Sequence, residues 1–144
     1  MIRSILLILF LCSFMKTDSK PDLIIRFDSI KDRTHNIFIA ICVQSSDFPD
    51  KLNVVRQFTL TPAQNKDLSV AVKDLPYGKY AISIFQDMNG NGKLDKGLFG
   101  IPTEPFAFSN NFHPRLRAPK WEDCEFEYNA KSNLIEIKGL ITML

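Results

Sequence analysis

Short hydrophobic runs recur along the chain about every ten residues, and polar turn residues separate them. No segment combines sustained helical periodicity with capping residues at its ends. Alternating or wholly apolar runs bounded by Gly, Pro, Asn, Asp or Ser are typical of β-strands. The pattern predicts strands over seven segments: 23–27, 37–43, 54–60, 68–72, 80–85, 124–128 and 134–140.

Strands without intervening helices predict an all-β fold, an antiparallel immunoglobulin-like β-sandwich of about seven strands, and exclude a doubly wound parallel sheet. Segment 37–43 is apolar on both faces, as a central strand should be. The last two strands are expected to form a closing hairpin across residues 129–133. The proline-rich stretch 97–121 is long for a connection, and its many aromatic residues predict that it folds back against the sandwich.

The N-terminal residues have a different pattern, because a short positive start is followed by the apolar run Ser4 to Met15 and then by abruptly polar residues. This order is typical of a secretory signal peptide, and the run is shorter than the roughly 20 residues of a spanning helix. A buried strand or an uncleaved anchor remains the alternative. We expect a leader over residues 1–19, one domain over residues 20–144, and a secreted or periplasmic location.

Cys12 offers a second mode of attachment, as the acylated residue of a lipoprotein, although residues 9–11 lack the small residue expected before such a cysteine. Membrane contact is therefore expected only through the leader or a lipidated Cys12. The net charge of +2 falls toward neutrality when Arg3 and Lys16 leave with the leader. A near-neutral domain has no electrostatic basis for binding nucleic acid.

Two cysteines lie beyond the leader, in different surroundings. Cys42 belongs to the apolar segment 37–43, and Cys124 alternates with Phe126 and Tyr128. In an oxidising compartment Cys42 and Cys124 could form a disulfide, and both could equally be buried free thiols. The sequence leaves the two alternatives open.

One acidic, glycine-rich loop, residues 87–95, carries a recognisable chemical pattern. Its first, third, fifth and ninth positions bear side-chain oxygens: Asp87, Asn89, Asn91 and Asp95. Gly92 stands sixth, where the loop must turn sharply, and Lys93 stands seventh, where its backbone carbonyl would be a ligand. Calcium takes six to eight oxygen ligands, so this spacing predicts a Ca²⁺ site.

The loop is not an EF-hand, because Leu98 occupies the closing twelfth position and the flanking segments are strand-like. We expect a calcium loop between strands, completed by a carboxylate from elsewhere: Glu104, Glu122 or Asp123. The alternative is a metal-free turn, since Asn-Gly occurs twice and favours tight turns. That alternative accounts for the glycines but not for the spacing of Asp87 and Asp95.

Other chemistry is less marked, because neither His35 nor His113 lies in a ligand pair and no nucleophile elbow is present. Residues 75–82 resemble the turn and strand of transthyretin-like and carboxypeptidase-regulatory-like sandwiches. Four ordered blocks resemble a bacterial exported family of unknown function, domain-of-unknown-function family 2141: residues 85–95, 99–104, 108–111 and 121–123. The family often has His where Gln86 stands, so no metal or catalytic role is carried over to Gln86. The resemblance implies an exported sandwich and supplies no substrate.

The expected function is a calcium-stabilised binding or structural module that contacts a protein or glycan at the cell surface. The candidate contact surface follows the loop in sequence: Phe108, Ser109, Asn110, Asn111 and Trp121. Alternatively, the aromatic residues simply cap the open end of the sandwich. An alternative from another class is a small extracytoplasmic hydrolase that uses acidic residues near the 87–123 loops.

Overall fold

The computed structural model describes residues 19–115 and 117–143. The expected leader lies outside these ranges except for its last residue, and so does Cys12. Within the described ranges, no helix combines the length and the apolar character needed to cross a membrane.

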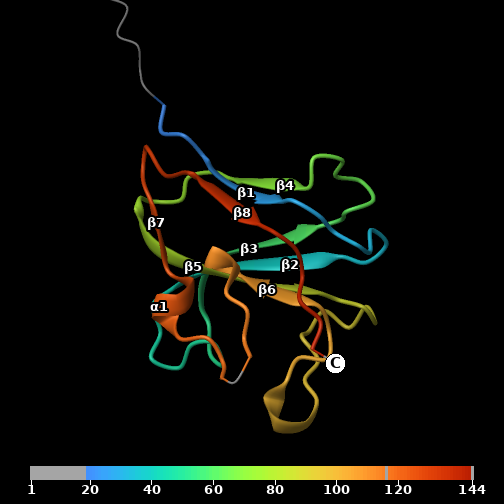
Figure 1. Ribbon diagram of the computed structural model, residues 1–144. Coiled ribbons are helices and arrows are strands. Elements are labelled where there is room, and N and C mark those ends of the chain that lie inside the picture. The colour runs from blue at the N-terminus through green and yellow to red at the C-terminus, as the bar shows by residue number, and fades with distance from the viewer. Residues whose placement is uncertain (1–18, 116, 144) are drawn as a thin grey trace, which may run out of the picture.

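The chain forms two stacked β-sheets with very little helix (Figure 1). The smaller sheet has the order β4–β1–β8, with bounds β1 Leu23–Phe27, β4 Ser69–Val72 and β8 Leu134–Ile137. The larger sheet has the order β3–β2–β5–β6, with bounds β2 Ile37–Val43, β3 Asn53–Leu60, β5 Gly78–Gln86 and β6 Phe106–Phe108. A further strand, β7 Phe126–Tyr128, pairs with the first residues of β5. The predicted all-β sandwich is confirmed at this level.

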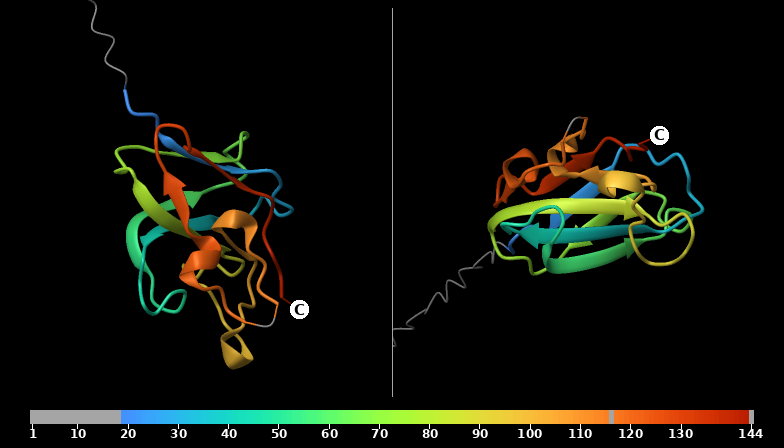
Figure 2. Two further views of the ribbon diagram at one scale, coloured as in Figure 1. Left: turned by 60° about the vertical axis from the view of Figure 1, so that its left-hand side comes forward. Right: turned by 90° about the horizontal axis from the view of Figure 1, so that it is seen from below.

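The main core lies between the two sheets. Alternate residues of β1 are buried there, and so are Ile37, Ile39 and Ile41 of β2. Because side chains of a strand point alternately to the two faces of a sheet, every second residue of each of these two strands meets the core. Figure 2 shows the two layers from two further directions.

Much of the stretch from residue 97 to residue 121 folds back onto the outer face of the larger sheet, as predicted, whereas Leu98 and Phe99 near its start stay exposed. Phe106, Phe108 and Trp121 form a second buried cluster there, together with Ala81 of β5 and Cys124. The stretch is not wholly irregular. It contains the three-residue strand β6, two short 3₁₀ turns, η1 Leu98–Gly100 and η2 Ser109–Asn111, and it leads into the helical turn α1 Trp121–Cys124. Elements of three or four residues are too short for hydrophobic periodicity to identify.

The predicted closing hairpin is wrong. Residues 129–132 do form a turn, with hydrogen bonds in both directions between Asn129 and Ser132, but the strands on either side join different sheets. Tyr128 of β7 pairs with Gly78 of β5, whereas β8 runs parallel to β1, with Leu134 opposite Ile24. Turn residues predict that the chain changes direction. They do not predict which strand each flanking segment pairs with, because that depends on which sheet edge is free. The β1–β8 pair is also the exception to the antiparallel arrangement that we expected.

Several strand boundaries also differ from the prediction, and the largest differences lie near the C-terminus. Cys124 ends α1 instead of beginning a strand, and β8 ends at Ile137 instead of residue 140. Cys42 and Cys124 are free thiols in the structure, and both are fully buried. Burial raises the pKa of Cys42 to about 11, and burial together with the neighbouring Asp123 carboxylate raises that of Cys124 to about 12.

Candidate functional site

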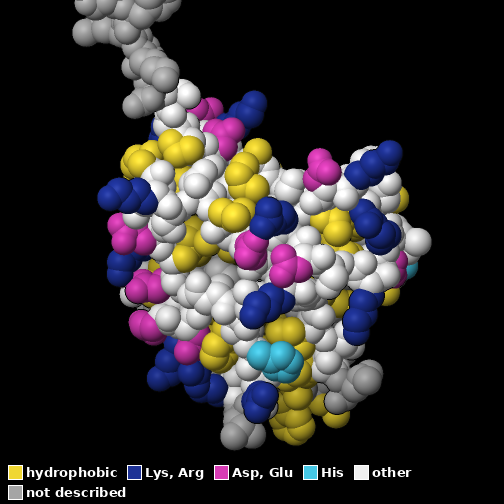
Figure 3. Space-filling view, turned by 45° about the horizontal axis from the view of Figure 1, so that its top comes forward, with side chains coloured by type: hydrophobic (Ala, Val, Ile, Leu, Met, Phe, Trp, Pro, Cys, Tyr) yellow, Lys and Arg dark blue, Asp and Glu magenta, His cyan; other side chains and the backbone are white. Residues whose placement is uncertain are grey.

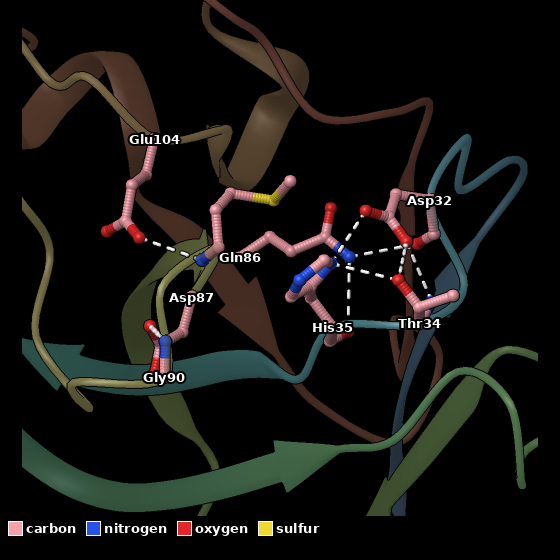
Figure 4. Close-up of polar contacts among 8 residues, drawn as sticks. Asp32, Thr34, His35, Gln86, Asp87, Gly90 and Glu104 are labelled. Atoms are coloured by element: carbon pink, nitrogen blue, oxygen red, sulfur yellow. Dashed lines mark hydrogen bonds and ion pairs between the residues drawn. The ribbon is translucent and has the colours of Figure 1, made fainter.

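The acidic loop begins where β5 ends, and the last residue of that strand fixes its position. Gln86 is buried, and its side-chain amide donates hydrogen bonds to the backbone carbonyls of Asp32 (2.9 Å) and His35 (3.1 Å) (Figure 4). The Asp87 N–H donates to the carbonyl of Asn36 at 3.0 Å. The loop therefore leaves the sheet from a point anchored to the connection between β1 and β2.

The Asp87 carboxylate organises the first half of the loop around itself. Its Oδ1 accepts the backbone N–H groups of Gly90 (2.7 Å) and Asn91 (3.1 Å), and its Oδ2 accepts that of Gly92 (2.7 Å). Gly90 and Gly92 have φ angles of 77° and 73°, a region that favours glycine. Burial raises the pKa of the Asp87 carboxyl, but the loop N–H groups together outweigh this effect and lower its pKa overall.

The other predicted ligands converge on Asp95. The side-chain amide of Asn91 donates to both carboxylate oxygens of Asp95, at 3.1 and 3.0 Å, and the amide of Asn89 donates to Oδ2. The amide oxygens of Asn89 and Asn91 accept the N–H groups of the residues two places further on, Asn91 (3.0 Å) and Lys93 (2.8 Å). Three of the four predicted side-chain ligands thus lie within hydrogen-bond reach of one another.

Of the three candidate carboxylates Glu104, Glu122 and Asp123, Glu104 is the one that contacts the loop. It is 4% exposed, and one of its oxygens accepts the N–H group of Met88 at 2.8 Å (Figure 4). Its other oxygen accepts the N–H group of Asp95 at 3.0 Å. Thr103 adds a backbone hydrogen bond to the Asp95 carbonyl at 2.9 Å. The sequence predicts Glu104 as a ligand, and the structure brings it to the loop, where its oxygens hold the backbone at the two ends of the loop.

The other two acidic candidates are used elsewhere. Asp123 forms a two-bond ion pair with Arg117 (2.6 and 2.9 Å) and accepts the Lys120 N–H at the start of α1. The hydrogen bonds from the Arg117 side chain and then from Lys120 lower the pKa of Asp123 to about 2. Glu122 is exposed on α1. Among the described residues, no group of three or more His, Cys, Asp or Glu side chains is arranged to hold a metal ion.

The expected contact surface is largely inside the protein, because Phe108, Ser109 and Trp121 are buried. The Ser109 hydroxyl accepts the Ile82 N–H at 2.9 Å and donates to the Cys124 carbonyl. The exposed residues Asn110 and Asn111 bond the backbone of neighbouring segments, at the carbonyls of Glu125 (2.8 Å) and Glu136 (2.9 Å). Their side-chain amides therefore fasten the segments around η2 to one another.

A polar group that the sequence did not single out lies beside the base of the loop. Asp32 accepts the N–H (2.7 Å) and the hydroxyl (2.6 Å) of Thr34 with one oxygen, and its other oxygen meets Nδ1 of His35 at 2.7 Å (Figure 4). The Thr34 hydroxyl also lies 2.9 Å from the same Nδ1. A catalytic relay needs the acid and the nucleophile on opposite ring nitrogens, so this group is a fixed turn and not a triad. The Asp-x-Thr spacing was the signal available for such a turn.

Comparison with known proteins assigns the chain. The model of a family described as an uncharacterized protein conserved in bacteria, domain-of-unknown-function family 2141, matches residues 25–136. The chain belongs to this family. The family match runs from β1 into β8 and includes the whole acidic loop with Glu104. No curated protein and no solved structure matches the chain.

Proposed function

We propose that this protein is an exported, transthyretin-like sandwich that works as a binding or structural module, with a Ca²⁺ ion held by the loop of residues 87–95. The observation that carries the proposal is the convergence of Asn89 and Asn91 on the Asp95 carboxylate. Their spacing is that of a calcium loop, and calcium selects carboxylate, amide and carbonyl oxygens.

The residues present can supply such an oxygen set. Asp95 offers two carboxylate oxygens. Asp87 can also bind an ion, because a carboxylate has about four lone-pair sites and Asp87 accepts only three N–H groups. The amides of Asn89 and Asn91 now turn their nitrogens to Asp95. To bind an ion, each amide would rotate and present its oxygen. The carbonyl of Lys93 is a further predicted ligand, and so is Glu104, whose oxygens now accept two backbone N–H groups.

In this arrangement the negative Asp95 carboxylate is stabilised by hydrogen bonds from the side-chain NH₂ groups of Asn89 and Asn91. A bound cation would take the place of these two NH₂ groups and would bring a full positive charge to the carboxylate. Because few carboxylates surround the site, the affinity expected is that of extracellular modules, about 10⁻⁴–10⁻³ M, which suits an exported protein. The ion would hold the loop and the segment after it in one conformation.

The hydrolase alternative receives no support from the described contacts. It requires Glu104 near Glu122 or Asp123 and a carboxyl with a raised pKa, whereas the pKa of Asp123 is lowered by Arg117. Two surface hollows, lined by residues between 59 and 70 and between 44 and 53, contain none of these three carboxylates.

Thermal unfolding in calcium, in magnesium and in chelator tests the proposal. At a calcium concentration one hundred times the dissociation constant, the folded state should gain about 2.7 kcal/mol. Asp95→Asn should abolish this gain, while Asp67→Asn, at an exposed carboxylate distant in sequence, should keep it. Asp87 is a poorer test residue, because its carboxylate also binds loop N–H groups without an ion. Equal melting temperatures of the wild type in calcium and chelator would remove the proposal.

A further inference from the structure

The segment that follows the acidic loop ends in an exposed hydrophobic tip, residues Leu98 to Ile101. Leu98 is 83% exposed and Phe99 is 98% exposed, and Ile101 at 45% lies beside them. The tip projects from one end of the sandwich (Figure 1), well away from the sheets. By contrast, Phe106 and Phe108 a few residues later are buried. Exposing two adjacent large apolar side chains costs solubility, so such a patch indicates a contact.

The tip has a defined conformation. A bridge between Lys96 and Pro102 closes it, and the Gly97 N–H donates to the Ile101 carbonyl at 2.8 Å. Phe99 has a φ of 61°, a left-handed conformation that is strained for a bulky residue. Surrounding structure must hold such a conformation, and strain of this kind gathers at binding segments.

The charged side chains on the arm that leads to the tip are Lys93, Asp95 and Lys96, and both lysines are exposed. The Asp95 carboxylate accepts hydrogen bonds from the side-chain amides of Asn89 and Asn91, and no acidic residue stands between positions 96 and 103. Lys96 reaches Asp50 at 3.4 Å, a surface ion pair that water and salt weaken. On the opposite arm Glu104 is buried, with its oxygens bound to backbone N–H groups. In Figure 3, hydrophobic side chains gather at the lower end of the molecule with Lys and Arg side chains beside them.

We propose that this tip inserts into the interfacial region of an anionic lipid bilayer, with Leu98 and Phe99 among the acyl chains and the two lysines at the headgroups. A lipid surface needs no shape complementarity, and the tip is a projection rather than a groove. Its N–H groups at Gly97, Gly100 and Ile101 are bonded within the tip, which lowers the cost of leaving water. Lysines near a membrane surface are attracted to anionic lipids.

This contact is separate from the calcium proposal and from any attachment through the leader or Cys12. The described chain begins at the end of the sandwich opposite the tip (Figure 1), so insertion would point that end away from the bilayer. The Asp95 backbone, bonded to Glu104 and Thr103, sets the base from which the tip projects.

Sedimentation of the purified protein with vesicles tests the proposal, in chelator so that calcium plays no part. We expect binding to vesicles of about three parts phosphatidylcholine to one part phosphatidylglycerol, and weaker binding to phosphatidylcholine alone. Phe99→Ser should lower the partition coefficient about tenfold or more, because a large apolar side chain leaves the membrane. Leu134→Ser, at an exposed apolar residue of β8, is the matched control and should bind like the wild type.

A second variant measures whether residue 99 enters the apolar part of the bilayer. In Phe99→Trp, the new indole should shift its emission to the blue when anionic vesicles are added, whereas the buried Trp121 is present in both proteins and supplies a constant background. Three outcomes would overturn the proposal: no binding of the wild type to anionic vesicles, equal binding by Phe99→Ser, or a tip-dependent dimer in sedimentation equilibrium that accounts for the exposed residues.

Discussion

Glu104 joins the two ends of the acidic loop, because one of its carboxylate oxygens accepts the Met88 N–H and the other accepts the Asp95 N–H at 3.0 Å. The side chain is almost wholly buried, so water cannot replace these bonds easily. The loop therefore has a closed base whether or not an ion occupies it.

Replacing Glu104 should loosen this base. In Glu104→Gln the side chain keeps one oxygen acceptor, and its NH₂ group would face one of the two N–H donors. We expect the free energy of unfolding to fall by about 1–3 kcal/mol, the usual cost of a buried polar group without its partner. Urea unfolding of the variant and the wild type measures the difference.

The matched control is Glu127→Gln, which makes the same chemical change at an exposed position of β7. It should alter stability by less than about 0.5 kcal/mol, as surface substitutions usually do. Equal effects at positions 104 and 127 would show that Glu104 does not hold the loop.

Two surface carboxylates, Asp32 and Asp123, should make the free energy of unfolding depend on pH in the acid range. Hydrogen bonds from the Thr34 side chain and then its N–H lower the pKa of Asp32 from 3.8 to about 2, and Arg117 and then Lys120 lower that of Asp123 from 3.8 to about 2. A carboxyl whose folded pKa lies below its unfolded pKa stabilises the fold above the unfolded value. That contribution is lost as pH falls through the folded value. We expect stability to decline between pH 3.8 and about pH 2.

Asp123→Asn checks this assignment, since it removes one titrating group while keeping a hydrogen-bonding side chain. Denaturant unfolding across the acid range should show a shallower decline for the variant than for the wild type. Parallel curves for the two proteins would mean that the Arg117–Asp123 pair does not contribute to the acid sensitivity.

The two buried thiols, Cys42 and Cys124, should react only slowly with thiol reagents in the folded protein. Burial raises the pKa of Cys42 to about 11 and, with Asp123, that of Cys124 to about 12, so little thiolate forms at neutral pH. A thiol-specific chromogenic reagent at about pH 8 should label them slowly in buffer and fast in denaturant.

The same labelling addresses their oxidation state. Denaturation without a reductant exposes the thiols if they are free, as the structure has them. Rapid labelling in buffer would contradict their burial. Thiols that appear in denaturant only after a reductant is added would mean that Cys42 and Cys124 pair in the exported protein.

Much of the fold is readable from local pattern. A short apolar run bounded by polar turn residues identifies β1, and the longer continuous apolar run identifies β2 as central. The loop of residues 87–95 is also readable. Gly90 and Gly92 stand where φ is positive, and the contacts among Asn89, Asn91 and Asp95 follow from spacing within nine residues.

The rest of the site was decided by long-range contacts. No local signal distinguishes Glu104, which reaches the loop, from Asp123, which binds Arg117. The three-residue strand β6 exists because β5 offers it an edge, and its two phenylalanines are buried for that reason.

By itself, the sequence determined the positions of most strands and the internal geometry of the acidic loop, because both depend on neighbours a few residues apart. Only the tertiary structure decided that β7 and β8 part to different sheets, that Glu104 closes the loop, and that Phe99 is exposed while Phe106 is buried. Each of these outcomes depends on which surface remains uncovered after the other elements have packed. That information is a property of the assembled sandwich and not of any short segment of the chain.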